Sequence, residues 1–265
     1  MEIIGYLSFI IMGIVLGLIG GGGSILTVPI LVYILGYDAV HATSYSLFIV
    51  GVASTFGTIQ YFRKSLVDIK AAIVFAVPSL ISVFLTRAYI LPALPDSLFS
   101  ISGFEVSKSI GVLILFALLM VASSITMIRS GSIDESKVIL PQTFNYMMIF
   151  LEGVLVGVLA GLVGAGGGFL IIPALVLLAK IPIKKAVGTS LVIIAINSTF
   201  GFTGDIFVNI EIDWLLLSIF TLFALMGIYI GTLLSKKLSG ATLKKGFGFF
   251  VLAMGIFILV KELIL

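Results

Sequence analysis

Long apolar stretches alternate with short polar connections along the whole chain. Many of these stretches approach the roughly 20 residues with which a helix crosses a hydrocarbon core about 30 Å thick. Few of them show the alternation expected of a barrel strand, so we interpret them as membrane-spanning helices. Two stretches, near residues 25–35 and 169–179, are shorter, and a helix of that length crosses about half of the core. The pattern predicts an all-α integral membrane protein with about 8 to 10 membrane segments.

Composition supports this interpretation. Hydrophobic residues make up 60% of the 265 residues and charged residues only 10%. A soluble domain carries about 25% charged residues, so this chain lacks the polar surface needed in water. The chain has no cysteine, which excludes disulfides and thiolate metal sites, and its net charge of +3 is scattered over the loops. We therefore expect a lipid bilayer as its surroundings, and neither nucleic acid, metal nor cofactor as a partner.

A glycine-rich run occurs twice in the chain. The segments Gly17–Pro29 (GLIGGGGSILTVP) and Gly161–Pro173 (GLVGAGGGFLIIP) have the same character and align at an offset of 144. The tripeptides Ala-Thr-Ser at 42–44 and Gly-Thr-Ser at 188–190 follow them at an offset of 146. This repetition predicts two homologous halves, and weak internal symmetry of this kind is typical of secondary transporters.

The positions of the charges predict how the two halves, residues 1–130 and 143–265, are oriented. If the chain reverses at each glycine run, each half contains a first helix, a returning half-helix and three further spans. Twelve of the fifteen Lys and Arg residues then lie on one membrane face. Positive charge marks the cytoplasmic face, so both termini are predicted outside the cytoplasmic membrane. Because five is an odd number, the second half is inverted relative to the first.

The glycine runs form the predicted binding site. Glycine is a poor helix former, and irregular backbone is tolerated at membrane depth only where protein buries it or where it lines a watery cavity. The N-terminus of the helix that follows offers free N–H groups and partial positive charge to an anion. The residues assigned to these turns are Gly20, Gly21, Gly22, Gly23, Ser24, Gly164, Gly166, Gly167 and Gly168. In the alternative interpretation, the glycines only allow close helix packing.

Other polar residues in the predicted spans extend the site. Thr43 and Ser44, and likewise Thr189 and Ser190, lie at the start of a span in each half, where helix capping is the alternative role. Asn197 falls inside a span, where its amide needs a polar partner. We therefore include these five residues among the predicted substrate ligands.

Two ionisable residues matter for the charge inside the protein. Glu152 falls near the middle of a span, and a carboxylate at that depth is costly enough to indicate a function. Glu152 is thus a candidate for coupling protons to anion movement, and the alternative is a neutral acid that hydrogen-bonds helices together. Arg87 is predicted near the outer end of its helix, with its charge at the surface. The interior is accordingly expected to contain no Lys or Arg.

The paired glycine runs, each ending in proline and each followed by a Thr-Ser pair, resemble the sulfite exporter TauE/SafE family of membrane permeases over both halves of the chain. The resemblance implies a secondary transporter that moves sulfite or another small sulfur-containing anion across the cytoplasmic membrane. A passive anion channel shares these features and stays open as an alternative. An enzyme is not expected, because the chain has no cysteine, no HExxH motif and no histidine deep within a span. The predicted partners are a small anion, the bilayer and protons.

Overall fold

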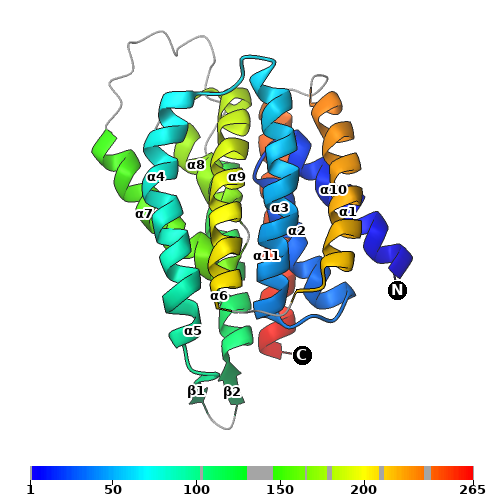
Figure 1. Ribbon diagram of the computed structural model, residues 1–265, viewed down its shortest axis with the longest axis vertical. Helices are drawn as coiled ribbons and strands as arrows, with labels where there is room; N and C mark the ends of the chain where they lie inside the picture. The colour runs from blue at the N-terminus through cyan, green and yellow to red at the C-terminus, as the bar shows by residue number, and fades with distance from the viewer. Residues whose placement is uncertain are drawn as a thin grey trace.

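The computed structural model describes residues 2–101, 104–129, 146–164, 166–177, 181–208, 212–235 and 240–264. These residues form a bundle of helices with one small hairpin (Figure 1). The first half contains α1 (Glu2–Ile19), α2 (Gly22–Pro29), the π-helical turn η1 (Ile30–Ile34), α3 (Ala39–Phe62), α4 (Ile69–Leu85), the π-helical turn η2 (Thr86–Ile90), α5 (Leu91–Ala93), β1 (Ser97–Ile101), β2 (Phe104–Ser107) and α6 (Lys108–Arg129). The second half contains α7 (Tyr146–Val163), α8 (Gly168–Leu177), α9 (Ile183–Phe207), α10 (Trp214–Leu234) and α11 (Gly240–Ile264).

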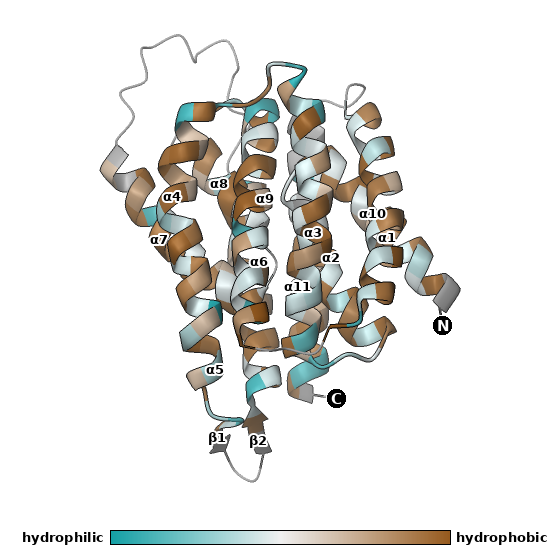
Figure 2. Ribbon diagram, viewed as in Figure 1, coloured by the Kyte–Doolittle hydropathy of each residue, from teal (hydrophilic) through white to brown (hydrophobic). Residues whose placement is uncertain are grey.

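Five helical segments of the described chain are long and apolar enough to cross a membrane. They are α3, the continuous stretch Ile69–Ala93, α6, α9 and α10. Apolar residues run along the length of the helices, and hydrophilic residues gather near their ends (Figure 2). Large apolar side chains such as Leu151, Leu215 and Leu222 are exposed on the outer faces, as lipid contact requires. The prediction of an all-α membrane protein is confirmed.

The chain breaks at both glycine runs, as predicted. Helix α1 ends at Ile19 and α2 begins at Gly22, while α7 ends at Val163 and α8 begins at Gly168. Helix α8 has 10 residues, so it is about 15 Å long, half the thickness of a hydrocarbon core. Each half thus provides one helix, one half-helix and three longer segments.

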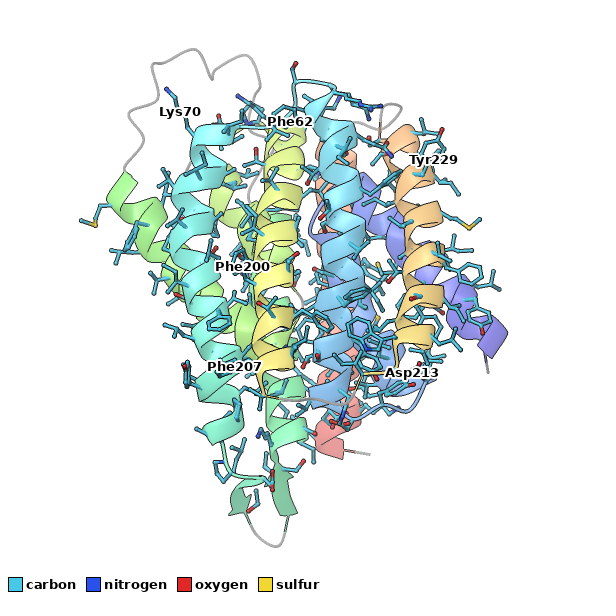
Figure 3. All side chains as sticks on the ribbon, in the orientation of Figure 1. Phe62, Lys70, Phe200, Phe207, Asp213 and Tyr229 are labelled. Atoms are coloured by element: carbon cyan, nitrogen blue, oxygen red, sulfur yellow. The ribbon has the colours of Figure 1, made fainter. Side chains whose placement is uncertain are left out.

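Helices α3 and α9, the third segments of the two halves, pack along each other. Helix α3 ends at Phe62 on the side of the bundle where Lys70 lies, whereas α9 ends at Phe207 towards the side where Asp213 lies (Figure 3). We call these sides the Lys70 end and the Asp213 end. The C-terminus and the hairpin also lie at the Asp213 end (Figure 1). Corresponding helices therefore run in opposite directions.

Helix α1 packs on α10, and α7 packs on α4, through matching glycines. A Cβ atom at Gly13 would lie 2.2 Å from the Ala224 carbonyl oxygen, and one at Gly157 would lie 2.5 Å from the Ser79 carbonyl oxygen. Gly13 and Gly157 occupy equivalent places in the two glycine-rich repeats, so Ser79 and Ala224 correspond as well. Such small residues let helices approach closely within a membrane. The two halves thus make equivalent contacts with each other.

The connection between α5 and α6 contains a small hairpin. Strands β1 and β2 pair antiparallel, with Ile101 opposite Phe104, and project from the Asp213 end. The boundary between the two predicted repeats, residues 131–142, lies outside the described residues. The division of the chain at residues 130 and 143 therefore stays a prediction.

Candidate functional site

The two glycine turns lie directly against each other. A Cβ atom at Gly21 would lie 2.1 Å from the carbonyl carbon and oxygen of Gly168, so the two backbones are in contact. Gly20 and Gly164, which are equivalent positions of the two runs, have φ angles of +80° and +70°. Residues with a Cβ atom rarely adopt this left-handed conformation, so each turn depends on glycine. The two turns therefore meet inside the bundle.

The second turn is the longer one. In the first turn, α2 begins at Gly22, close to Gly20. In the second turn, α8 begins only at Gly168, and more residues separate it from the equivalent Gly164. Gly166 and Gly167 also have positive φ angles, of +63° and +72°. A Cβ atom at Gly166 would lie 2.5 Å from the Ser198 hydroxyl oxygen on α9. The second turn therefore brings bare backbone against α9.

Arg87 of η2 lies beside this second turn. Its side chain is fully buried, and a Cβ atom at Gly164 would lie 2.3 Å from Arg87 Nη2 and 2.1 Å from Thr43 Cβ. The expectation that Arg87 reaches the outer surface is wrong, because η2 turns its side chain towards α9 and the glycine turn. The expectation of an interior without Lys or Arg is wrong for the same reason.

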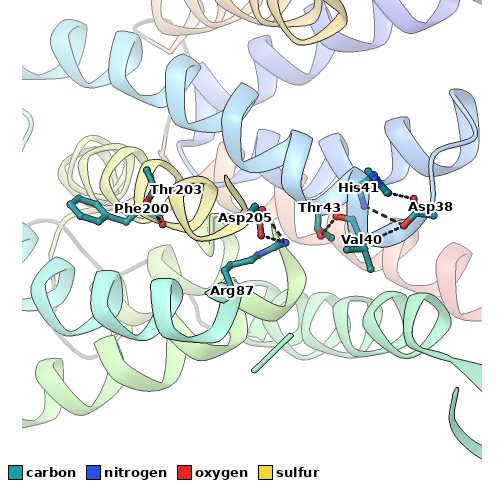
Figure 4. Close-up of polar contacts among 8 residues, drawn as sticks. All are labelled: Asp38, Val40, His41, Thr43, Arg87, Phe200, Thr203 and Asp205. Carbon is teal, nitrogen blue, oxygen red and sulfur yellow. Dashed lines mark hydrogen bonds and ion pairs between the residues drawn. The ribbon is translucent and has the colours of Figure 1, made fainter. Parts of the chain in front are cut away.

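Arg87 is paired with Asp205 of α9 (Figure 4). Both carboxylate oxygens of Asp205 lie 3.3 Å from the same nitrogen, Arg87 Nη1. Within the described residues, Arg87 Nε and Nη2 have no hydrogen-bond partner. These two nitrogens form the planar fork with which arginine binds two oxygens of an oxyanion. The free fork therefore lies beside the second glycine turn.

The ion pair joins the two halves of the protein but lies beside only one of the two glycine turns. In the register that aligns Ser79 of α4 with Ala224 of α10, Arg87 corresponds to Thr232. The contacts of Gly20 and Gly164 likewise align α9 with α3, and Asp205 then corresponds to Tyr61. Thr232 and Tyr61 are both neutral, and the Tyr61 hydroxyl donates a hydrogen bond to the Gly17 carbonyl oxygen at 3.0 Å. The two turns thus share a backbone geometry, and the second one alone has this charged pair beside it.

The hydroxyls predicted at the turns are buried, and several bond to their own helices. Ser24 donates to the Gly21 carbonyl oxygen at 2.7 Å, Thr43 to that of Val40 at 2.9 Å and Ser190 to that of Val187 at 2.8 Å. Thr43 nevertheless touches Gly164, and Ser190 touches Gly20, where a Cβ atom would lie 2.7 Å from its oxygen. Ser44 lies beside the Asp205 carboxylate. These four side chains therefore surround the two turns.

Comparison with known proteins agrees with this arrangement. A family model described as Sulfite exporter TauE/SafE matches residues 6–258. The chain belongs to the TauE/SafE family. A "Probable membrane transporter protein" of Xylella fastidiosa strain Temecula1 is 31% identical over 264 residues, which cover 94% of this chain and 91% of the relative. Similar proteins of Methanocaldococcus jannaschii (29% over 270 residues, 94% of each chain) and Bacillus subtilis (28% over 262 residues, 89% and 92%) bear the same description. No solved structure matches the chain.

The remaining predicted ligands of this TauE/SafE protein lie further from Arg87 or pack elsewhere. Asn197 accepts a hydrogen bond from Ser79 at 2.8 Å, and its Nδ2 has no partner among the described residues. Thr189 accepts one from the Asp68 backbone at 2.8 Å, which fixes the loop at the Lys70 end. Ser198, which contacts Gly166 and also has no described partner, is a candidate ligand that the sequence analysis missed. Its only sequence signal was the repeat of Ser-Thr-Phe-Gly, at 54–57 and 198–201.

Two predicted glycines, Gly23 and Gly167, have a packing explanation. A Cβ atom at Gly23 would lie 2.3 Å from Leu16 Cβ, and one at Gly167 would lie 2.9 Å from Ala160 Cβ. These two glycines let each half-helix pack closely against the helix before it. This is the alternative role, close helix packing, given in the sequence analysis. Gly22 is the first residue of α2.

Glu152 lies away from the turns. It precedes Gly164 by twelve residues, which places it about 18 Å back along α7. Its side chain is half-exposed, and the neighbouring Gly153 faces α4. The coupling role of Glu152 stays a prediction, and the structure places it in no contact with the turns.

A pocket of about 530 Å³ opens at the Asp213 end, beside the first turn of α3. It is lined by Gly36, Tyr37, Asp38, His41, Tyr45, Ile212 and Asp213. Asp38 caps α3 and also pairs with the His41 ring. Burial raises the pKa of the Tyr37 hydroxyl, and the nearby Tyr45 and Asp213 raise it further. The hydroxyl therefore stays neutral. Thr43 lies between this pocket and the Arg87–Asp205 pair (Figure 4), so one turn of α3 separates the two.

Proposed function

We propose that the protein is a secondary transporter that binds a small anion between Arg87 and the second glycine turn. The Nε and Nη2 of a buried arginine, which have no partner among the described residues, are the observation that carries this proposal. Buried polar groups are nearly always hydrogen-bonded, so two free N–H donors on one guanidinium indicate a missing acceptor. An oxyanion with two oxygens at the spacing of the fork satisfies both donors.

The charge of this pair and the close packing at Gly164 support a substrate class. The carboxylate of Asp205 already balances the charge of Arg87, and Gly164 stands where even a methyl group would collide. A small, singly charged oxyanion fits these limits better than a large organic acid. The name of the family whose model matches refers to sulfite export. Sulfite or a small organosulfonate is therefore the proposed substrate, and the cytoplasmic membrane is the proposed location.

Transport requires the site to open in turn towards each side of the membrane. Arg87, Thr43 and Ser44 are buried, so the structure represents a closed state of the site. The pocket at the Asp213 end approaches the site from one side and is separated from it by one turn of α3. We propose that movement of α3 against α9 connects the pocket with Arg87. We propose that this pocket faces the outside of the cell, because the loops rich in Lys and Arg are expected at the cytoplasmic face.

Reconstitution into liposomes tests the proposal and separates a transporter from a channel. Purified protein should catalyse exchange of radiolabelled sulfite or sulfonate against an excess of unlabelled anion inside the liposomes, because an alternating carrier exchanges its substrate. A channel gives only downhill flux and no such counterflow. Arg87→Gln removes the charge and the fork, and should abolish the exchange. Exchange at the wild-type rate by a folded Arg87→Gln protein would refute the site.

A further inference from the structure

We infer that Asp205 binds the proton that couples anion transport to the proton gradient, and that it does so when the anion takes Arg87. This inference rests on the proposed anion site. It assigns the coupling proton to a residue that touches the anion-binding arginine, in place of the distant Glu152.

The charge balance of the closed site carries the argument. Arg87 and Asp205 are both about 1% exposed, and together they are neutral. A singly charged anion on the free fork would leave the site with one net negative charge. An unbalanced buried charge is strongly unfavourable, so the anion needs a compensating positive charge. One proton on the Asp205 carboxylate restores neutrality, with one O–H bond formed and no other bond changed.

The geometry of the ion pair allows this exchange. Both Asp205 oxygens share Nη1 at 3.3 Å, which is longer than the roughly 2.7–2.9 Å of a strong charged hydrogen bond. The pair therefore occupies one nitrogen of Arg87 and leaves the stronger two-point position open. When the anion takes that position, it competes with Asp205 for the same positive charge. Protonation of Asp205 removes the competitor, so proton and anion bind together.

Among the described residues, no other titratable group is placed to take this proton. In the described part of the chain, Arg87 is the only charged side chain in contact with Asp205, and Ser44 beside it does not titrate. The other titratable side chains on the elements that pack against α9 are His41, Tyr45, Tyr61, Lys70 and Tyr89. His41 pairs with Asp38, and the hydroxyls of Tyr45 and Tyr61 bond to backbone groups. Tyr89 is 57% exposed, and Lys70 lies at the opposite end of the bundle. Helix α8 has no titratable side chain.

Proton uptake by the wild-type protein is the first test, and it needs no variant. Methanesulfonate is a suitable probe, because a sulfonate stays singly charged between about pH 5 and pH 8. Binding to purified protein in weak buffer should take up one proton per anion wherever Asp205 is ionised beforehand. In that range, affinity should rise about tenfold for each unit by which the pH falls. If methanesulfonate binds but no proton is taken up at every pH tested in this range, the inference is overturned. If none of the anions tested binds, the proposed function is overturned as well.

Three variants then locate the proton. Asp205→Asn keeps an oxygen for Nη1 but cannot ionise, so its affinity for methanesulfonate should not depend on pH and its binding should take up no proton. Asp205→Glu restores a carboxylate and should restore the pH dependence. Glu152→Gln should show the wild-type proton uptake. If Asp205→Asn still takes up one proton per anion, or if Glu152→Gln loses the uptake, Asp205 is not the coupling residue.

Discussion

Arg87 Nη2, which has no partner among the described residues, lies 2.3 Å from the point where a side chain at Gly164 would begin. This contact joins two features that are far apart in the sequence, a buried charge and a left-handed glycine. It explains why the backbone at this point must be bare: a methyl group would collide with Arg87 Nη2 and with Thr43. The proposed site depends on this contact.

Gly164→Ala should therefore weaken anion binding, because its Cβ would press on both Arg87 and Thr43. We expect affinity to fall by more than about tenfold, which corresponds to about 1.4 kcal/mol. Calorimetry with the purified variant measures this change.

Gly36→Ala is the matched control. Gly36 has a φ of +77°, close to that of Gly164, but nothing lies within 4 Å of its hypothetical Cβ. The two variants thus share the backbone strain and differ in the contact with Arg87. Equal losses of affinity in both would show that strain alone, and not the space beside Arg87, explains the effect.

Ser24→Ala should weaken the fold more than it weakens binding. The Ser24 hydroxyl donates a hydrogen bond to the Gly21 carbonyl oxygen within the first glycine turn. A buried hydrogen bond of this kind contributes about 1 kcal/mol to the stability of the fold. Ser8→Ala is the control: it removes a hydrogen bond of the same length, from Ser8 to the Ile4 carbonyl oxygen on α1, at an exposed position. This variant should change stability by less than about 0.5 kcal/mol. Thermal unfolding of the two variants compares them. A larger loss of stability in Ser8→Ala would contradict the role given to Ser24.

Hydropathy and glycine spacing were sufficient to predict the architecture. The long apolar runs marked the helices, and the two glycine runs marked where α1 and α7 end, because both signals are local in the sequence. The same local signals do not separate glycines in the turns from those that pack helices. Gly20 and Gly23 look alike in the sequence, yet Gly20 has a positive φ and Gly23 sits within α2.

The ion pair could not be predicted in this way. Arg87 and Asp205 are 118 residues apart, and each lies near the end of an apolar run, where a charge ordinarily belongs to the surface. Only the packing of η2 against α9 brings them together. The sequence alignment also paired Thr43 with Thr189, because the two Thr-Ser pairs look alike. The contacts of Gly20 and Gly164 instead relate Thr43 to Val187, in the register of the glycine runs.

The predicted orientation can be tested by labelling with an impermeant thiol reagent, because the chain has no cysteine of its own. Ser65 and Ser97 are exposed and lie on connections at the two ends of the bundle. Ser97→Cys should be labelled in intact cells, and Ser65→Cys only after the membrane is made permeable. If Ser65→Cys is labelled in intact cells and Ser97→Cys is not, the protein has the opposite orientation to the one predicted.

The most direct test of the central claim is calorimetric binding of methanesulfonate and sulfite to the wild-type protein and to Arg87→Lys. Lysine keeps the positive charge for Asp205 but lacks the planar fork, so this variant isolates the two-point contact. A charged hydrogen bond contributes about 1.5–3 kcal/mol, so we predict that Arg87→Lys binds at least about tenfold more weakly than the wild type. Thermal unfolding and size-exclusion chromatography confirm that the variant is folded. If folded Arg87→Lys binds both anions as tightly as the wild type, the fork of Arg87 does not hold the substrate.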